Sequence, residues 1–156
     1  MSNWFQNYHA GLNKAIMMSI ELAISDFQIL RCFPVIFQLR PHLEQAKFVE
    51  KVRYQMKEGY QLAFLEVEKQ VVAIAGFRIS NCLALGKFLY IDDLVVDQLK
   101  RSHSYGQQLF QWLIEYAKNH ECKHLSLDSG VQRFAAHRFY LMQRMSITSH
   151  HFSMEL

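Results

Sequence analysis

The chain has 156 residues, a length that fits one domain of ordinary size. Hydrophobic residues make up 51% and charged residues 20% of it, which excludes a disordered chain or a collagen-like repeat. The net charge of +3 is too close to balance for a dedicated nucleic-acid binder. No apolar run approaches the roughly 18 residues of a membrane span. We therefore expect an N-terminal arm or extension over residues 1–17 and a single domain over 18–156.

The cysteines indicate a reduced protein without a thiolate metal site. Cys32, Cys82 and Cys122 are an odd number, are widely spaced and form no C-x-x-C pair. His120, Cys122 and His124 alternate, but a helix-to-strand boundary divides them, so we expect solvent exposure rather than zinc binding. No metal is expected. The N-terminus also lacks the pattern of a secretory signal, and we expect a cytoplasmic protein.

The first quarter of the chain after the arm predicts a strand and two helices. Residues 20–24 alternate like a short strand, and Ser25-Asp26 then offers an N-cap for a helix. Pro34 lies inside that helical pattern and should kink or divide it. Arg40-Pro41 ends the segment, because the residue before proline avoids helical angles. A second helix is expected over residues 43–56.

The middle of the chain predicts three strands. Residues 60–67, 71–79 and 88–96 are rich in β-branched and aromatic side chains and are separated by polar turns. Gly76, inside the second of these runs, indicates a β-bulge.

The last third predicts alternating helices and strands. A helix is expected over 105–119, a strand over 124–128, a helix over 134–144 and a final strand over 147–154. The whole order is then β-α-α-β-β-β-α-β-α-β, an α/β or α+β domain built on a mixed sheet.

A strand, a basic loop and a helix start follow one another at residues 94–107. The first amides of a helix have no intrahelical partner and carry about half a positive charge, so they suit a phosphate group. Lys100, Arg101 and His103 would add to the positive field, and Gly106 would let a ligand approach the backbone. The alternative is an ordinary connection in which Ser104 caps the helix and Gln107 completes a capping box.

The segment Arg101-Ser102-His103-Ser104-Tyr105-Gly106 resembles the cofactor motif of the GCN5-related N-acetyltransferase (GNAT) superfamily, Arg/Gln-x-x-Gly-x-Gly/Ala. It matches at Arg101 and Gly106, whereas Ser104 replaces the first glycine; at positive φ a serine there would add strain of about 1 kcal/mol or more. The resemblance implies acetyl-CoA as cosubstrate, its pyrophosphate on the loop amides and its pantetheine arm along the preceding strand. It places these residues at the cofactor: Leu94, Val95, Val96, Arg101, Ser102, His103, Ser104, Tyr105, Gly106 and Gln107.

Residues 135–145 resemble the C-terminal motif of the same superfamily, in which Phe-Tyr lies near the acetyl thioester. Phe139-Tyr140 matches it, while Arg133 stands where asparagine is usual and Met145-Ser146 where Gly-Phe is usual. The resemblance implies that Tyr140 is the general acid for the coenzyme A thiolate. The alternative is a core tyrosine whose hydroxyl bonds a carbonyl. The likeness covers nearly the whole chain after residue 17 and implies a mostly antiparallel central sheet with a splayed strand pair, flanked by helices.

Asp92 and Asp93 stand in an otherwise apolar strand, where unpartnered carboxylates are costly. Because strand neighbours face opposite sides, we expect one of them in the substrate cleft and the other in the opposite layer. Either could accept the proton of the amine, directly or through water. A cap or an ion pair is the alternative for each.

Three further residues are candidates for substrate binding. Asp128 and Ser129 end a strand, where ligand sites of α/β sheets commonly lie. His137 is three residues before Tyr140, on the same helical face, although a packing histidine is the alternative. The arginines of the first two helical segments are expected on solvated faces, some of them at the acceptor entrance: Arg31, Arg40 and Arg53.

These observations predict an N-acetyltransferase in which a primary amine attacks acetyl-CoA directly in a ternary complex. No Ser–His–Asp arrangement or G-x-S-x-G elbow indicates a serine hydrolase. The alternative is a non-catalytic coenzyme A-binding regulatory or interaction module of the same fold. The acceptor is left open between small-molecule, peptide and protein amines; no nucleic-acid or membrane partner is expected, and a homodimer is left open.

Overall fold

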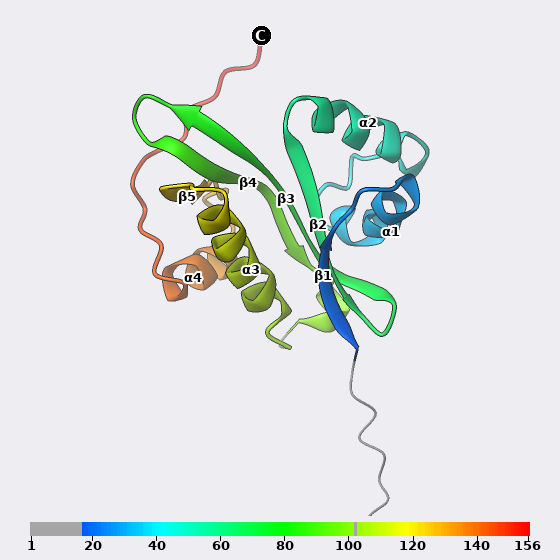
Figure 1. Cartoon of the computed structure of the whole chain (residues 1–156). Helices are drawn as coiled ribbons and strands as arrows, with labels where there is room; N and C mark the ends of the chain where they lie inside the picture. The colour runs from blue at the N-terminus through cyan, green and yellow to red at the C-terminus, as the bar shows by residue number, and fades with distance from the viewer. Residues whose placement is uncertain (1–16, 102) are drawn as a thin grey trace, which may run out of the picture.

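The computed structural model describes residues 17–101 and 103–156. Its five strands lie in the order β1-β2-β3-β4-β5, and every neighbouring pair is antiparallel except β4 and β5, which are parallel (Figure 1). The elements in chain order are β1 (Met18–Leu22), α1 (Asp26–Ile36), α2 (Gln45–Lys57), β2 (Tyr60–Val67), β3 (Gln70–Cys82), β4 (Gly86–Val96), a 3-10 turn η1 (Gln98–Lys100), α3 (Tyr105–Asn119), β5 (His124–Leu127) and α4 (Phe134–Met142). None of the described helices is long and apolar enough to cross a membrane.

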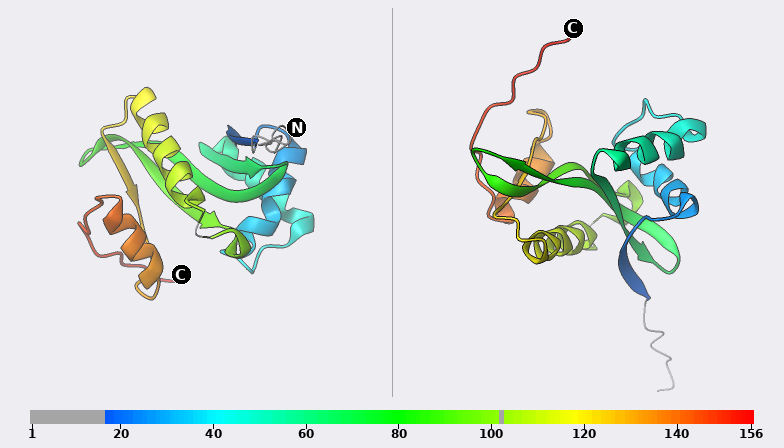
Figure 2. Two further views of the ribbon diagram at one scale, coloured as in Figure 1. Left: turned by 90° about the horizontal axis from the view of Figure 1, so that it is seen from below. Right: turned by 45° about the horizontal axis from the view of Figure 1, so that its top comes forward.

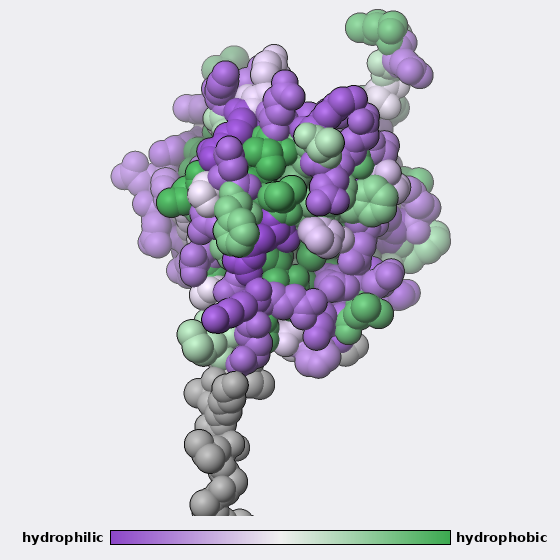
Figure 3. Space-filling view, turned by 90° about the vertical axis from the view of Figure 1, so that its right-hand side faces the viewer, coloured by the Kyte–Doolittle hydropathy of each residue, from purple (hydrophilic) through white to green (hydrophobic). Residues whose placement is uncertain are grey.

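Helices cover both faces of the sheet, α1 and α2 on one side and α3 and α4 on the other (Figure 2). Successive strand residues point to opposite faces, so each strand contributes to both cores. Phe64 and Ile74 pack under α1 and α2, while Leu65 and Phe77 pack under α3. The face over α1 and α2 keeps apolar side chains in contact with solvent, and the space-filling view of that side shows apolar surface ringed by polar groups (Figure 3). The exposed apolar side chains of the two helices include Phe27, Leu30 and Tyr54.

The predicted fold class and the predicted order of elements are confirmed as far as α4. Ser25 caps α1 as expected, since its side chain accepts from the amide of Gln28 in a capping box. Pro34 lies inside α1 but does not divide it; the helix ends two residues later, at Ile36. The arm predicted over residues 1–17 lies outside the described residues except for Met17.

The strand predicted over residues 147–154 does not form. Residues 145–156 contain no helix or strand, and the last of them lead away from the body of the domain (Figure 1). An alternating pattern becomes a strand only where the chain finds a neighbour to pair with. Here the segment meets the end of β5, where His151 contacts Asp128, instead of running along the edge of that strand.

Strands β4 and β5 part halfway along β4. Their ladder joins residues 88–91 to residues 124–127, and beyond Ile91 strand β4 is paired with β3 alone. The backbone groups of Leu94, Val95 and Val96 that face away from β3 therefore have no partner in β5. The predicted splayed strand pair is confirmed.

A β-bulge lies beside this parting. Gly76 pairs with Asp93 and Phe77 with Ile91, so Asp92 is the extra residue of β4. Ile91 before the bulge and Leu94 after it both pack with α3. The two aspartates between them therefore face the α1 and α2 side together, and the expectation that they point to opposite layers is wrong. The bulge that Gly76 indicated breaks the alternation on which that expectation depended.

Candidate active site

The start of α3 is an uncapped helix end. Ser104 precedes the helix with φ of 58°, in the left-handed region, and its hydroxyl makes no capping hydrogen bond. The interpretation of Ser104 and Gln107 as a capping box is therefore wrong. A non-glycine residue in this conformation is strained by about 1–2 kcal/mol. The geometry leaves the first amides of α3 free to bind an anion, with the positive end of the helix dipole behind them.

The loop before α3 is held by its own side chains and by one side chain from the segment after α1. Asp97 accepts from the amide of Leu99 at 3.0 Å, and the amide of Gln98 donates to Gln38 of the segment after α1 at 2.9 Å. The Nδ1 of His103 lies 2.9 Å from the carbonyl of Arg101, and its ring stacks on Tyr105. His103 therefore braces the loop with one nitrogen. Ser102 lies outside the described residues.

Two cations of this loop remain free to act on a ligand. Within residues 17–101 and 103–156, neither Lys100 nor Arg101 forms an ion pair. Both lie within five residues of the first residue of α3, so their charges add to the positive field there.

Gly106 serves packing between α3, β4 and α4. A Cβ at this position would lie 3.2 Å from Cγ2 of Val96 and 3.9 Å from the ring of Phe139. The missing side chain thus lets the helix start approach the end of β4. The contacts of this Cβ support a packing role for Gly106, and the approach of a ligand to its backbone stays a prediction.

The two aspartates of the bulge are each bound to an arginine. Asp93 accepts from Nε of Arg40 at 2.8 Å with one oxygen and from the hydroxyl of Tyr60 at 3.2 Å with the other. Asp92 accepts from Nε of Arg78 at 3.0 Å with one oxygen. Burial, followed by the charge of Asp93, raises the pKa of Tyr60 well above its usual value, so this hydroxyl remains a donor. These hydrogen bonds fix the directions of both carboxylates.

Asp128 lies on the same face as these aspartates. It follows β5, and it accepts from the hydroxyl of Tyr90 at 2.8 Å across the β4–β5 pair. Burial and this hydrogen bond raise the pKa of Tyr90 to about 12. The Nδ1 of His151, from the C-terminal segment, contacts the same carboxylate oxygen at 3.0 Å.

The neighbouring Ser129 is a buried hydroxyl without a partner. Among the described residues its Oγ has no hydrogen-bond partner. A buried hydroxyl left unpaired costs about 1–3 kcal/mol, so a ligand atom or a water is expected to complete it.

His137 ties down the loop that follows Asp128. Its Nε2 lies 2.9 Å from the carbonyl oxygen of Gly130, and since a carbonyl only accepts, the proton is on Nε2. The contact supports the packing alternative for His137, because this nitrogen is used within the chain.

Tyr140 lies on the opposite side of the sheet from the aspartates. Its ring packs against Phe110 and Phe139 in the core under α3. Among the described residues its hydroxyl has no hydrogen-bond partner, contrary to the alternative of a tyrosine tied to a carbonyl. Burial raises the pKa of Tyr140, which keeps its proton in place at neutral pH. A free phenolic donor thus stands on one face of the parted strands, and three carboxylates stand on the other.

Sequence reasoning missed the partners of the aspartates: Tyr60, Arg78 and Tyr90. Their positions follow from the strand register, in which Tyr60 opposes Arg78 and Arg78 opposes Tyr90. The sequence signal for these partners was a polar residue in each of three adjoining strands, at positions that oppose one another. The arginines expected on solvated helix faces are partly exposed, and each also forms an ion pair: Arg31 with Glu66, Arg40 with Asp93 and Arg53 with Asp26.

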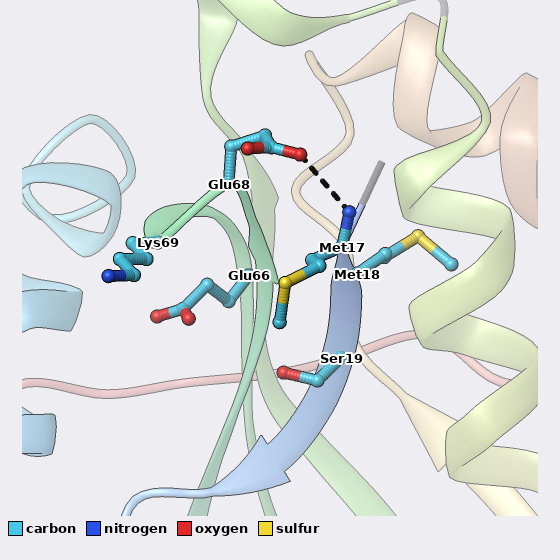
Figure 4. A pocket seen from close by; sticks show the side chains of 6 residues that line it. All are labelled: Met17, Met18, Ser19, Glu66, Glu68 and Lys69. Atoms are coloured by element: carbon cyan, nitrogen blue, oxygen red, sulfur yellow. Dashed lines mark hydrogen bonds between the residues drawn. The ribbon is translucent and has the colours of Figure 1, made fainter. Parts of the chain in front are cut away.

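A shallow hollow at the β1 edge of the sheet is separate from this site (Figure 4). There the amide of Met17 donates to Glu68 at 3.1 Å, beside Met18 and Lys69. None of the candidate site residues lines it. The described residues also contain no group of three or more His, Cys, Asp or Glu side chains arranged to hold a metal ion.

The chain matches the family model described as "Acetyltransferase (GNAT) family" over residues 27–144. It is 31% identical over 125 residues to the uncharacterized N-acetyltransferase YhdJ of Bacillus subtilis (strain 168), an alignment that covers 80% of this chain and 88% of the relative. The chain therefore belongs to the GNAT family of acetyltransferases. The predicted enzyme class, an acyltransferase that acts on nitrogen, is confirmed.

Solved structures share the fold at low sequence identity. The aminoglycoside N-acetyltransferase AAC(6')-Iy, in complex with CoA, has a TM-score of 0.81 at 11% identity and covers 93% of this chain and 98% of its own. The ribosomal-protein-alanine N-acetyltransferase of Brucella melitensis biovar Abortus 2308 has a TM-score of 0.77 at 12% identity, covering 90% and 99%. A transcriptional regulator from Bacillus halodurans C-125 has a TM-score of 0.80 at 18% identity, covering 90% and 100%. These likenesses show the fold.

Proposed function

We propose that this protein transfers the acetyl group of acetyl-CoA to a primary amine by direct attack in a ternary complex. The observation that carries the proposal is the gap between β4 and β5, which begins beyond Ile91 and ends at the uncapped start of α3. The unpaired edge of β4 suits the amides of a pantetheine arm, and the free helix amides suit a diphosphate. The fold neighbour AAC(6')-Iy was solved with CoA, which supports the same choice of ligand.

The residues that would hold acetyl-CoA fall into two groups. Backbone groups of Leu94, Val95 and Val96 would pair with the arm, and the stretch 101–107 would bind the pyrophosphate, with Arg101 adding its charge. The unpartnered hydroxyl of Ser129 fits a further polar atom of a ligand. Acetyl-CoA, when bound, supplies the acetyl group as an activated thioester.

Tyr140 is the proposed general acid, since its hydroxyl is free and protonated on the α3 side of the gap. On the other side, one oxygen of Asp92 accepts from Arg78, and the other makes no hydrogen bond to any described residue. Asp93 has both oxygens engaged. We assign Asp92 to receive the proton of the amine, directly or through water, and Asp93 to position Arg40 and Tyr60.

The acceptor is a primary amine of a small molecule, a peptide or a protein. The aminoglycoside and the ribosomal-protein alanine belong to the fold neighbours that carry those names. We place the enzyme in the cytoplasm, which agrees with Cys32, Cys82 and Cys122 all being free thiols.

Titration calorimetry with coenzyme A and acetyl-CoA, followed by thiol release with a panel of amines, tests the proposal. We expect binding of both ligands and steady thiol release with at least one amine. Arg101→Gln should weaken coenzyme A binding, whereas Lys118→Gln, near the far end of α3 and paired with Glu115, is the matched control. Binding without thiol release in any combination would favour the non-catalytic module. Absence of binding would overturn the assignment of the gap.

A further inference from the structure

Three carboxylates lie on one face where β4 and β5 part, but their charges are not balanced equally. Asp92 is neutralised by Arg78, and Asp93 is neutralised by Arg40. Asp128 has neither a lysine nor an arginine within ion-pair distance among the described residues. Within the described part of the chain, it is therefore the one of these three carboxylates without an arginine or lysine partner to compete with an incoming cation.

The surroundings of Asp128 fix its direction and leave it accessible. Tyr90 donates to Oδ2 at 2.8 Å, and a tyrosine that keeps its proton cannot neutralise the carboxylate. The Asp128 side chain is 48% exposed, so a ligand can reach it from the solvent. The residue follows Leu127, the last residue of β5 that pairs with β4, and so stands at the mouth of the gap.

The chain itself already places a nitrogen donor on this carboxylate. The Nδ1 of His151 lies 3.0 Å from Oδ2 of Asp128, although the His151 side chain is 65% exposed and belongs to a segment without helix or strand. A contact of this kind between exposed groups contributes about 1 kcal/mol or less. A stronger N–H donor can therefore displace it.

We propose that Asp128 is the anchor for the ammonium group of the acceptor and that His151 occupies this anchor in the free protein. The inference rests on the proposed function and narrows its acceptor to amines that arrive as cations. Alkyl amines resemble lysine, whose ordinary pKa is about 10.4, so nearly all of such an acceptor is protonated at neutral pH. A carboxylate without a lysine or arginine partner at the mouth of the gap favours the protonated amine. Aromatic amines are neutral at the same pH and gain nothing from this charge.

The test uses n-propylammonium chloride as the probe on the full chain without coenzyme A. The ring C–H signals of His151 and Tyr90 are followed by NMR at constant pH and ionic strength, with His151→Ala, Asp128→Asn and Tyr90→Phe to assign them and to measure the effect. We expect saturable shifts of both rings in the wild type. The His151→Ala variant should bind propylammonium about two- to fivefold more tightly, because the imidazole that competes for Asp128 is gone.

Tetramethylammonium chloride, which has no N–H donor, and sodium chloride are the matched controls. Unshifted signals with propylammonium, or equal shifts with sodium chloride, would overturn the anchor. Asp128→Asn should lose the propylammonium effect, and its unfolding transition shows whether it still folds. If Asp128→Asn does not fold, the affinity of the His151→Ala variant for propylammonium decides the test alone. Coenzyme A binding is measured separately, so a failure of the proposed function is distinguished from a failure of the anchor.

Discussion

Gly76 in β3 and Tyr60 in β2 fit against each other, because the ring of Tyr60 fills the space where a side chain at position 76 would begin. A Cβ on Gly76 would overlap the hydroxyl of Tyr60 and lie 2.7 Å from its Cε2. The same hydroxyl donates to Asp93, the residue that opposes Gly76 across the strand pair. A glycine at position 76 is therefore required for the hydrogen bond that Tyr60 of β2 makes across β3 to Asp93 of β4.

We expect Gly76→Ala to lower the free energy of unfolding by about 2–3 kcal/mol, since Tyr60 must move and Asp93 loses a donor. Urea denaturation measures the change. Gly130→Ala is the control, because the Cβ there would meet the flexible, exposed side chain of Gln132. An equal loss in both variants would contradict the role given to Tyr60.

Ser104→Gly should stabilise the protein. The residue has φ of 58°, a region that glycine adopts without the steric penalty of a Cβ, and the gain is expected at about 0.5–1 kcal/mol. Affinity for coenzyme A should be retained, because the amides of α3 keep their directions. Ser149→Gly, in the irregular C-terminal segment and without positive φ, is the matched control and should not gain stability.

Tyr140→Phe should lower turnover by about a hundredfold with little change in the affinity for coenzyme A, as expected for the loss of a general acid. Tyr54→Phe, on the exposed surface of α2, is the control. Because burial raises the pKa of Tyr140 above its ordinary value of 10.0, its deprotonation should reduce the rate only above pH 10. Wild-type turnover in the variant would remove this residue from the mechanism.

The two aspartates of the bulge should respond differently to amidation. Asp93→Asn leaves Arg40 without its counter-ion and weakens the contact with Tyr60, so the main loss is expected in stability. Asp92→Asn keeps an oxygen for Arg78 but cannot accept a proton, so the main loss is expected in turnover. Denaturation curves and steady-state rates of both variants separate the two roles. A loss of turnover confined to Asp93→Asn would exchange the assignments.

Stability should fall at alkaline pH through Tyr60. Its pKa in the folded state is well above the ordinary 10.0, so above pH 10 the unfolded chain gives up a proton that the folded protein retains. The unfolded state then binds fewer protons, and the free energy of unfolding decreases as pH rises, by up to about 1.4 kcal/mol per pH unit from this residue. Tyr60→Phe should show a shallower decrease. Tyr54→Phe should retain the wild-type slope.

Local patterns predicted the elements that have sharp boundaries. The helix over 105–119 and the strand over 60–67 were expected at their observed bounds, because a clear period ended at polar or glycine residues. The strand expected over 147–154 failed, because a pattern cannot supply the neighbour that a strand needs. The motif resemblance predicted a cofactor loop at residues 101–107, and the uncapped start of α3 is consistent with that prediction.

The surroundings of the aspartates could not be predicted from the sequence. Gly76 indicated a bulge but not that β4 takes the extra residue, and that choice decides which way Asp92 points. The partner of Asp128 is 38 residues away along the chain and is fixed by a register that no local pattern contains. Such contacts depend on how strands far apart in sequence are aligned.

The extra residue of β4 also determines where this chain tolerates insertions and deletions. Removing Asp92 would restore strict alternation and leave Ile91 and Leu94 on the same side of the sheet, whereas removing a residue from Leu94 to the end of β4 would turn side chains to the wrong side and disturb both cores. The hairpin between β3 and β4, where Leu83 is fully exposed, can lengthen or shorten without such a reversal. Length variation in functional variants should therefore concentrate at that hairpin, and within the middle of β4 only the loss of one of the two aspartates would preserve the two faces of the strand.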